Sequence, residues 1–119
     1  PYAERLIVDR AYDTIDWFSA CDVVITDYSG LAVEAAIAKK PTYFYLYDLA
    51  AYTAERGLNV DLKAEAIGSY VFEDAASLAA CIAEGTYDLG ALRAFRDKYL
   101  ECPDEGNTEK LAAFVIDML

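Results

Sequence analysis

The stretch "DVVITDYSG", residues 22–30, decides the fold together with "LAVEAAIAKK" at 31–40 directly behind it. The apolar, β-branched run at 22–27 is typical of an inner strand that is covered on both faces. The alanine-rich residues 30–40 predict a helix, and the two lysines at its end suit the negative helix C-terminus. We therefore predict a strand, a tight polar turn and a helix in immediate succession.

Strands and helices alternate along the rest of the chain. The aromatic residues 41–48 predict a strand that Pro41 opens, and residues 69–74 predict another. Such alternation with short connections predicts an α/β fold, a Rossmann-like parallel sheet with helices on both faces. We further expect a strand at 5–9, helices at 13–21, 48–57, 74–85, 89–101 and 107–119, and a loop at 58–68.

The length of 119 residues predicts a single domain over 1–119, with the helices of 89–119 at its C-terminal end. Hydrophobic residues make up 56% of the chain, which is ample for a core. About four or five strands are expected, fewer than the six of a complete Rossmann sheet. The chain also starts with proline and not methionine. We therefore expect a truncated domain of a longer protein that holds only part of an active site.

The charge and the residue types exclude several classes of function. The net charge is −11, with 21 acidic and 10 basic residues, whereas a nucleic-acid binder needs a basic surface. No nucleic-acid partner is therefore expected, and an anionic ligand must be held locally by backbone N–H groups and a few placed side chains. The chain contains no histidine, which excludes histidine-based catalysis and His-ligated zinc within it.

The cysteines and the hydropathy pattern set further limits. Cys21, Cys81 and Cys102 lack the paired spacing of metal ligands, so we predict free thiols, a reducing compartment, no metal and no cofactor. No apolar run reaches the roughly 18 residues of a membrane span. Contact with a membrane is therefore expected only through other parts of the parent protein.

The polar turn after the strand at 22–27 is the first candidate site. Ligands of open α/β sheets bind outside the carboxyl ends of the strands, where helix N-termini present free N–H groups. A diphosphate fits such a turn through backbone donors, a hydroxyl and a glycine that permits close approach. The alternative is a local role, in which Ser29 caps the helix and Asp27 stabilises its dipole. The candidate diphosphate-binding residues are Thr26, Asp27, Ser29 and Gly30.

Glu34 extends this candidate site by one helical turn. It is the only charged residue from Leu31 to Ala38, and a lone carboxylate on a packed helix is costly unless it reaches a partner or a ligand hydroxyl. Its spacing from Gly30 places both residues on one helix face. The alternative is that Glu34 simply emerges at the solvent edge.

Asp48, Tyr52 and Arg56 form a second candidate group, in "YDLAAYTAERG" behind the aromatic strand. Arg56 is able to meet a phosphate, and pairing with Glu55 or another nearby acid is the alternative. The aromatic residues of 43–47 are assigned mainly to sheet packing.

Several separated motifs keep one order along the chain. They are Thr26-Asp27-Tyr28-Ser29 at a strand end, Glu34, Lys40-Pro41 before an aromatic strand, Tyr45 to Leu49, Tyr52 to Gly57, and "DEGNTEK" at 104–110. In this order they resemble the CDP-glycerol glycerophosphotransferase family, the teichoic acid primases and polymerases. The resemblance covers nearly all of residues 18 to 119.

The resemblance implies that the chain is most of the C-terminal, donor-binding half of a GT-B glycosyltransferase-like fold. It places Ser29 and Gly30 at the diphosphate of the donor CDP-glycerol, and Glu34 at hydroxyls of the ribose or of nearby donor groups. Gly30 stands where the family has a second serine, and Glu34 is one methylene longer than the usual aspartate. The family's donor-binding histidine and a further base lie outside this chain, so no catalytic residue is expected in this segment.

The reaction implied by the resemblance is attack by a terminal glycerol hydroxyl on the β-phosphate of CDP-glycerol. It releases CMP and extends a poly(glycerol phosphate) chain. Poly(glycerol phosphate) or a lipid-linked acceptor is then bound through the N-terminal half, and the fragment alone is expected to be inactive. The implied location is cytoplasmic, peripheral on the inner face of the cell membrane.

Three alternatives stay open on the residues alone. The first is a related transferase with another activated donor, carrying ribitol phosphate or a sugar. The second is a binding half without catalytic activity. The third is a phosphoacceptor receiver domain, because "VVITD" ends a strand in an aspartate; receivers need a second acid near the first strand, and here Asp9 stands alone.

Overall fold

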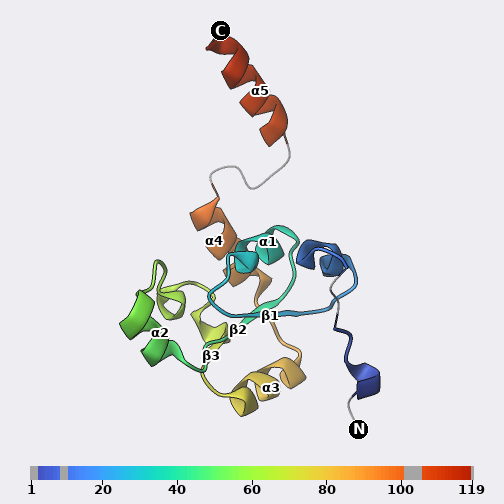
Figure 1. Ribbon diagram of the computed structural model, residues 1–119, viewed down its shortest axis with the longest axis vertical. Helices are drawn as coiled ribbons and strands as arrows, with labels where there is room; N and C mark the ends of the chain where they lie inside the picture. Colours follow the sequence, from blue (N-terminus) through green and yellow to red (C-terminus); the bar gives the residue numbers. More distant parts are fainter. Residues whose placement is uncertain (1–2, 9–10, 101–105, 119) are drawn as a thin grey trace.

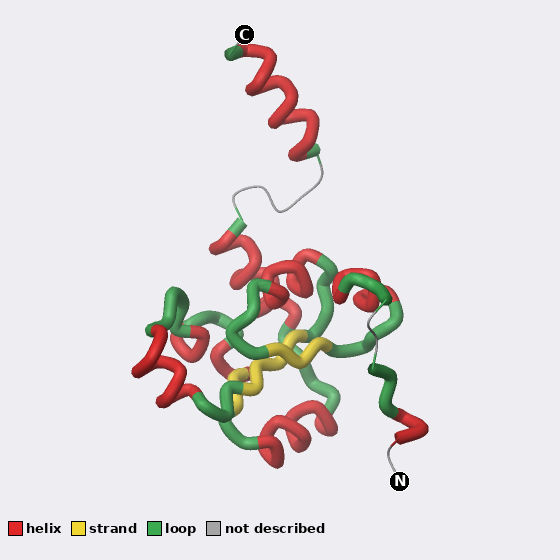
Figure 2. The backbone as a smooth tube through the Cα atoms, viewed as in Figure 1, coloured by secondary structure: helices red, strands yellow, loops and turns green. Residues whose placement is uncertain are grey.

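The computed structural model describes residues 3–8, 11–100 and 106–118. Its centre is a three-stranded parallel sheet in the order β1-β2-β3, with bounds Val24–Thr26, Thr42–Tyr45 and Val71–Phe72 (Figure 2). The strand β2 pairs with a neighbour on both sides. The predicted α/β class with a parallel sheet is confirmed.

Helices cover both faces of this sheet (Figure 1). α1 (Leu31–Ile37) and α4 (Leu89–Tyr99) pack against each other on one face, and α3 (Ala75–Glu84) lies on the other. α2 (Leu49–Arg56) follows β2 at the carboxyl edge of the sheet. The arrangement is that of a partial Rossmann-like domain. The GT-B assignment concerns a two-domain protein and stays a prediction.

Small residues allow α1 to approach the sheet and α4 closely. Ala32 and Ala36 are buried in one cluster with Phe44 of β2 and Phe95 of α4. Ala35 is also fully buried, against Val24 and Phe18. Alanine combines high helix propensity with a small side chain, so one sequence pattern both forms the helix and packs it. The N-terminus of α1 is thereby fixed beside the carboxyl end of β1.

Side-chain caps and a glycine set the ends of α3 and α4. Asp74 accepts a hydrogen bond from the Ser77 N–H at 2.8 Å, and Asp88 accepts one from the Gly90 N–H at 2.7 Å. Gly85 ends α3 with a φ of 68°, in the left-handed region that glycine enters without a steric penalty. The helix predicted at 74–85 is therefore confirmed, with Asp74 as its N-cap and Gly85 at its end.

α1 ends in a Schellman motif that has no glycine. The Lys40 N–H donates to the Ala35 carbonyl at 2.9 Å, and the Lys39 N–H donates to the Ala36 carbonyl at 3.1 Å. Lys39 has a φ of 57°, and no other residue except glycine has a positive φ within the described ranges. This conformation brings the Cβ of an L-residue too close to backbone carbonyl oxygen, so a lysine here is under local strain.

Two predictions for the N-terminal half were wrong. The strand expected at 5–9 does not form in its described part, because residues 6–8 are exposed and have no pairing strand; residue 9 lies outside the described residues. The strand β1 lies at the edge of the sheet, and Ile25 is 51% exposed, so it is not covered on both faces. Apolar composition indicates a strand without showing whether a neighbouring strand is present.

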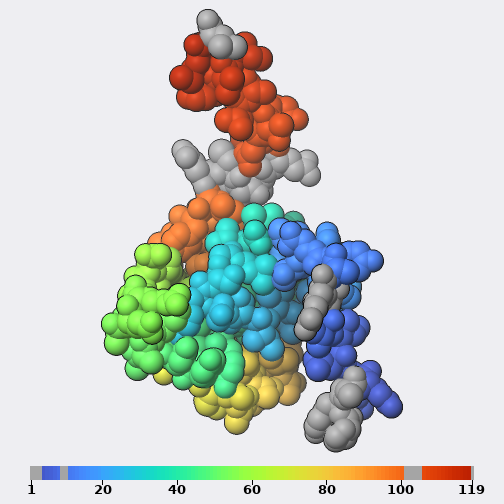
Figure 3. All heavy atoms as spheres, in the orientation of Figure 1, coloured from blue at the N-terminus to red at the C-terminus, as the bar shows by residue number. Residues whose placement is uncertain are grey.

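The remaining elements are short or project from the body. The helix predicted at 13–21 is a 3-10 helix, Thr14–Ser19, and the loop predicted at 58–68 carries 3-10 turns at Leu62–Ala64 and Gly68–Tyr70. α5 (Asn107–Asp117) stands away from the body, and all its side chains are exposed (Figure 3). Cys102 and the first two residues of the motif at 104–110 lie outside the described residues. Within the described parts, no helix has the length and apolar character to cross a membrane.

Candidate functional site

A pocket lies at the carboxyl end of β1. Its volume is about 180 Å³, and the turn at 28–30, the first residues of α1, the C-terminal half of α4 and the chain after α2 form its wall. Ser29 and Gly30 line it from the turn, and Phe95 and Tyr99 line it from α4. It therefore occupies the edge of the sheet where ligands of parallel α/β folds bind.

The turn in front of α1 is braced by its own side chains. The Asp27 carboxylate accepts the Ser29 N–H at 3.0 Å, and the Ser29 hydroxyl oxygen accepts the Leu31 N–H at 3.2 Å. The Gly30 N–H donates to no described atom. Two of the amides that a phosphate would use are therefore already satisfied, and the Gly30 amide with the Ser29 hydroxyl proton remains for a ligand.

Gly30 has an ordinary right-handed backbone conformation. Its φ is −59° and its ψ is −14°, and a Cβ placed on it would meet no atom within 4 Å. Neither the backbone nor the packing thus requires glycine here. No protein atom approaches the Gly30 backbone closely. The close approach expected from the sequence therefore applies only to a bound ligand.

Tyr28 links this turn to α2. Its hydroxyl donates to the Asp48 carboxylate at 3.0 Å, and its ring stacks on the Tyr52 ring with centroids 3.7 Å apart. The Arg56 guanidinium carbon lies 5.8 Å from the centroid of the Tyr52 ring, a cation–π distance. Burial, followed by the hydrogen bond and the charge of Asp48, raises the pKa of Tyr28 to about 12. The hydroxyl therefore stays protonated and keeps donating at neutral pH.

Gly57 directs the chain after α2 into the pocket wall. It has a φ of 72°, the left-handed region that favours glycine, and accordingly ends the helix. Leu58, Asn59 and Val60 then line the pocket opposite the turn at 28–30. The predicted end of the helix at Gly57 is confirmed.

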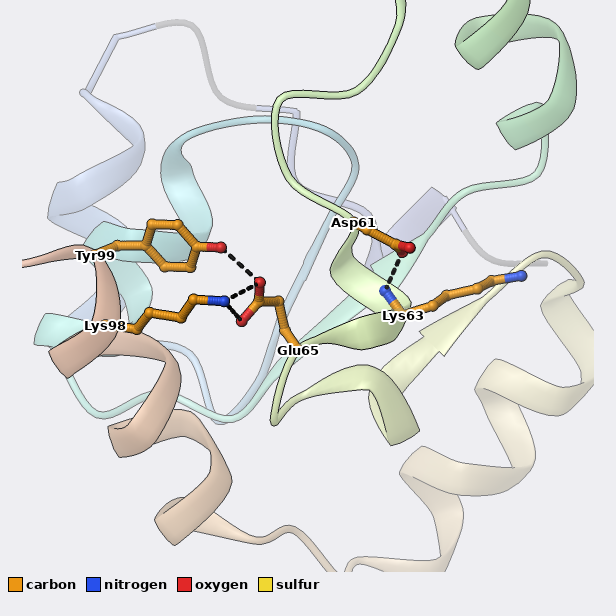
Figure 4. Close-up of polar contacts among 5 residues, drawn as sticks. All are labelled: Asp61, Lys63, Glu65, Lys98 and Tyr99. Atoms are coloured by element: carbon orange, nitrogen blue, oxygen red, sulfur yellow. Dashed lines mark hydrogen bonds and ion pairs between the residues drawn. The ribbon is translucent and has the colours of Figure 1, made fainter.

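A polar cluster joins the loop after α2 to the end of α4 beside the pocket (Figure 4). The Glu65 carboxylate receives the Lys98 Nζ at 2.7 and 2.8 Å and the Tyr99 hydroxyl at 2.6 Å. The Lys98 and Tyr99 hydrogen bonds lower the pKa of Glu65, and the Glu65 side chain is only 9% exposed. In the same loop Asp61 accepts the Lys63 N–H at 3.2 Å.

The structure brings part of the predicted site together. Ser29, Gly30 and Tyr52 line the pocket. Asp48 lies behind them, where it fixes Tyr28. Three other candidates are not in the pocket wall: Thr26 is buried in β1, while Asp27 and Glu34 are exposed.

Arg56 is exposed and lies over the Tyr52 ring, without a recorded acidic partner among the described residues. The aromatic run packs as predicted in its first part, since Tyr43 is 2% and Phe44 is 1% exposed, while Tyr47 is exposed. In the described residues, no group of three or more potential metal ligands gathers.

Sequence reasoning missed several residues of the pocket wall. Tyr28 was part of the quoted motif, yet its position one residue before Ser29 gave no sign of its bond to Asp48, twenty residues away. Phe95 and Tyr99 fall in the helix predicted at 89–101, and Asn59 falls in the loop predicted at 58–68. Only the packing of α1 against α4 shows that these residues meet the turn.

The family of the chain follows from comparison with known proteins. A family model described as CDP-Glycerol:Poly(glycerophosphate) glycerophosphotransferase matches residues 3–117. The chain belongs to this family. The resemblance inferred from the motifs is confirmed. Membership of a glycerophosphotransferase family also decides between a transferase and a phosphoacceptor receiver domain in favour of the transferase.

Relatives in the glycerophosphotransferase family carry two kinds of name. A teichoic acid glycerol-phosphate primase of Bacillus subtilis (strain 168) is 32% identical over 119 residues, which are 99% of this chain and 31% of the relative. A teichoic acid ribitol-phosphate primase of Bacillus spizizenii is 30% identical over 110 residues, 92% of this chain and 28% of the relative. The chain therefore spans about a third of the length of these relatives. No solved structure matches it.

Proposed function

We propose that this chain binds the donor of a glycerophosphotransferase, with CDP-glycerol as that donor and its diphosphate at the turn formed by Ser29 and Gly30. The observation that carries the proposal is the pocket at the carboxyl end of β1 in a chain of this family. The Ser29 hydroxyl proton and the Gly30 amide are the donors left for phosphate oxygens. Asp27 accepts the Ser29 N–H and so holds the turn, and the buried Thr26 ends β1 directly before it.

The proposed reaction makes one bond and breaks one. A terminal glycerol hydroxyl of poly(glycerol phosphate) or of a lipid-linked acceptor attacks the β-phosphorus of CDP-glycerol, and the phosphoanhydride bond to CMP breaks. The acceptor hydroxyl loses its proton, and the CMP oxygen leaves with the electron pair. This chain contributes donor binding, and we assign no catalytic residue to it. The reacting end of the acceptor and the peripheral position on the cytoplasmic face of the cell membrane are assigned to other parts of the protein.

A titration of the intact protein with CDP-glycerol tests the proposal. The variant Ser29→Ala is expected to weaken CDP-glycerol binding about tenfold, because a hydrogen bond to a charged group contributes about 1.5–3 kcal/mol. The matched control is Ser69→Ala, an exposed serine at some distance along the chain. Equal affinity in wild type and Ser29→Ala, with unchanged thermal stability, would place the diphosphate elsewhere.

The identity of the activated polyol is a second question for the same titration. Relatives named for glycerol phosphate and for ribitol phosphate both match this chain, at 32% and 30% identity. CDP-ribitol is therefore the competing donor. If CDP-ribitol binds more tightly than CDP-glycerol, the proposed donor site stands and the proposed polyol becomes ribitol.

Glu34 is proposed to meet donor hydroxyls when the donor is bound. Its side chain is exposed and lies outside the pocket wall, so it reaches a ligand only from the rim. Asp48, Tyr52 and Arg56 act less directly in this proposal. Asp48 and Tyr52 hold Tyr28, and the exposed Arg56 places a positive charge near the same rim.

A further inference from the structure

A second pocket lies at the opposite end of α1. It has a volume of about 350 Å³ and lies between the C-terminal end of α1 and the N-terminal half of α4. Lys39 lies three residues before the start of β2, so this pocket is at the amino edge of the sheet, whereas the candidate donor pocket is at the carboxyl edge. Its volume is in the range of ordinary small-ligand sites, about 300–1,000 Å³.

Basic side chains make up half of the residues that line this second pocket. Lys39, Arg93 and Arg96 line it, which is three of the ten basic residues of a chain with net charge −11. Among the described residues, its lining includes no carboxylate. Asp97 pairs with Arg96 at 2.6 Å and with Arg93 at 3.6 Å, and it neutralises one of the three charges. An excess of positive charge therefore remains at the pocket.

Arg96 is buried, and Lys39 is strained. Arg96 is 8% exposed, and its guanidinium pairs with Asp97, the kind of partner that allows a charged side chain to be buried. Lys39 has a φ of 57° at the Schellman position of α1, where glycine is the favoured residue. Strained residues gather at functional sites, and here the strain places a lysine at the pocket. The strain at Lys39 and the meeting of three cations are the two observations that distinguish this cavity.

We propose that this pocket binds a phosphodiester anion, separately from the donor pocket. Two guanidinium groups and an ammonium group suit phosphate oxygens by charge and by hydrogen-bonding geometry. A glycerol phosphodiester, the repeating unit of poly(glycerol phosphate), is the ligand that fits this chemistry. The choice of glycerol rests on the proposed function, whereas the binding of a phosphate-type anion rests only on the residues of the pocket.

A soluble phosphodiester suits this pocket better than a membrane surface. Anionic lipid attracts clusters of several exposed basic residues, whereas the net charge of this chain is −11. Arg96 lines the pocket and is only 8% exposed, so a flat membrane surface does not reach its guanidinium. The headgroup of phosphatidylglycerol carries the same glycerol phosphodiester, and the experiment therefore includes it.

The test uses the intact protein and glycerophosphoglycerol, a single phosphodiester flanked by two glycerols. The double variant Lys39→Gly with Arg93→Gln is expected to weaken glycerophosphoglycerol binding at least tenfold and to leave CDP-glycerol binding unchanged. Lys39→Gly places the favoured residue at the strained position, and Arg93 is exposed, so thermal stability is expected to be equal or higher. The matched control, Arg5→Gln with Lys110→Gln, removes the same charge elsewhere.

The outcomes separate this inference from the proposed donor site. Ser29→Ala is expected to leave glycerophosphoglycerol binding unchanged; a loss there would assign the diester to the donor pocket and overturn the inference. Absence of glycerophosphoglycerol binding in wild type, or equal binding in the double variant, also overturns it. Binding of the protein to phosphatidylglycerol vesicles is the remaining outcome. If the double variant abolishes this binding and the control variant does not, the ligand is a lipid headgroup, and the inference of a soluble phosphodiester is overturned. If CDP-glycerol fails to bind while the diester binds as described, only the proposed donor function falls.

Discussion

At the scale of single residues, Tyr28 is the contact that holds the candidate donor turn in place. Its hydroxyl reaches Asp48, and its ring lies flat on Tyr52, so two different interactions tie the turn to α2. Asp48 is half-buried, and loss of the tyrosine hydroxyl would leave its carboxylate without this donor. The turn therefore depends on a residue that does not itself carry the predicted phosphate contact.

Replacement of Tyr28 by phenylalanine is expected to lower the free energy of unfolding by about 1 kcal/mol, the usual contribution of one hydrogen bond. A double-mutant cycle with Asp48→Ala, measured by chemical denaturation, is expected to give a coupling energy of similar size. Tyr47→Phe, at an exposed ring, is the control and is expected to change little. Additive effects of the Tyr28 and Asp48 variants would show that this bond does not stabilise the turn.

At the scale of elements, the cluster of Glu65, Lys98 and Tyr99 fixes the loop after α2 against the end of α4. The loop and the helix are more than thirty residues apart, and both border the donor pocket. The Lys98 and Tyr99 hydrogen bonds lower the pKa of the Glu65 carboxyl. The same contacts raise the pKa of Lys98, mainly through its hydrogen bond to Glu65.

The lowered pKa of Glu65 gives a pH dependence with a definite sign. A carboxyl whose pKa is lower in the folded state stabilises the fold above its ordinary pKa, and this contribution is lost as the pH falls through the folded-state pKa. Unfolding curves of wild type and Glu65→Gln are therefore expected to differ at neutral pH and to converge on acidification. The measurement is chemical denaturation across a pH series.

The control for this prediction is Glu73→Gln. Glu73 pairs with Lys63, and both side chains are 48% exposed, so solvent screens that pair. Its curve is expected to stay close to wild type at every pH. A Glu65→Gln difference that persists unchanged at acid pH would assign the effect to packing and not to ionisation.

At the scale of the whole molecule, β2 is the centre of the described structure. It pairs with a strand on each side, and Thr42, Tyr43 and Phe44 are buried. α2, by contrast, has no buried residue. Local stability therefore varies across the molecule, and the region around the donor pocket includes one of its less protected elements.

Hydrogen exchange is expected to show this contrast directly. Amides of β2 are expected to exchange slowest, and amides of α2 much faster, in mass spectrometry of the intact protein without ligand. Added CDP-glycerol is expected to slow exchange in the peptide that covers residues 27–33. Exchange in β2 as fast as in α2 would contradict the central position of that strand.

The sequence was informative where local chemistry decides the structure. The alternation of strands and helices, the cap at Asp74 and the helix ends at Gly57 and Gly85 follow from periodicity and from single residues with special roles. The edge position of β1 and the missing strand at 5–8 depend on neighbours in space, which periodicity does not contain.

The same limit applies to the candidate site. Ser29 and Gly30 were accessible to prediction because a strand, a polar turn and a helix follow one another directly. The contribution of Phe95 and Tyr99 to the pocket could not be predicted from the sequence, because α4 reaches the pocket only by packing on α1. The strain at Lys39 was equally hidden, because the sequence there predicts a helix end with favourable charges and gives no backbone angle.

Gly30 has open space around its Cα, so a side chain at this position would not affect the fold. An additional side chain would enter solvent and would leave the backbone angles unchanged. Replacing glycine by serine there would change the groups that a ligand at this turn meets. The backbone and the packing of the protein would stay the same. If the proposed function is right, a change of residue 30 is expected to alter donor preference while the scaffold stays as it is.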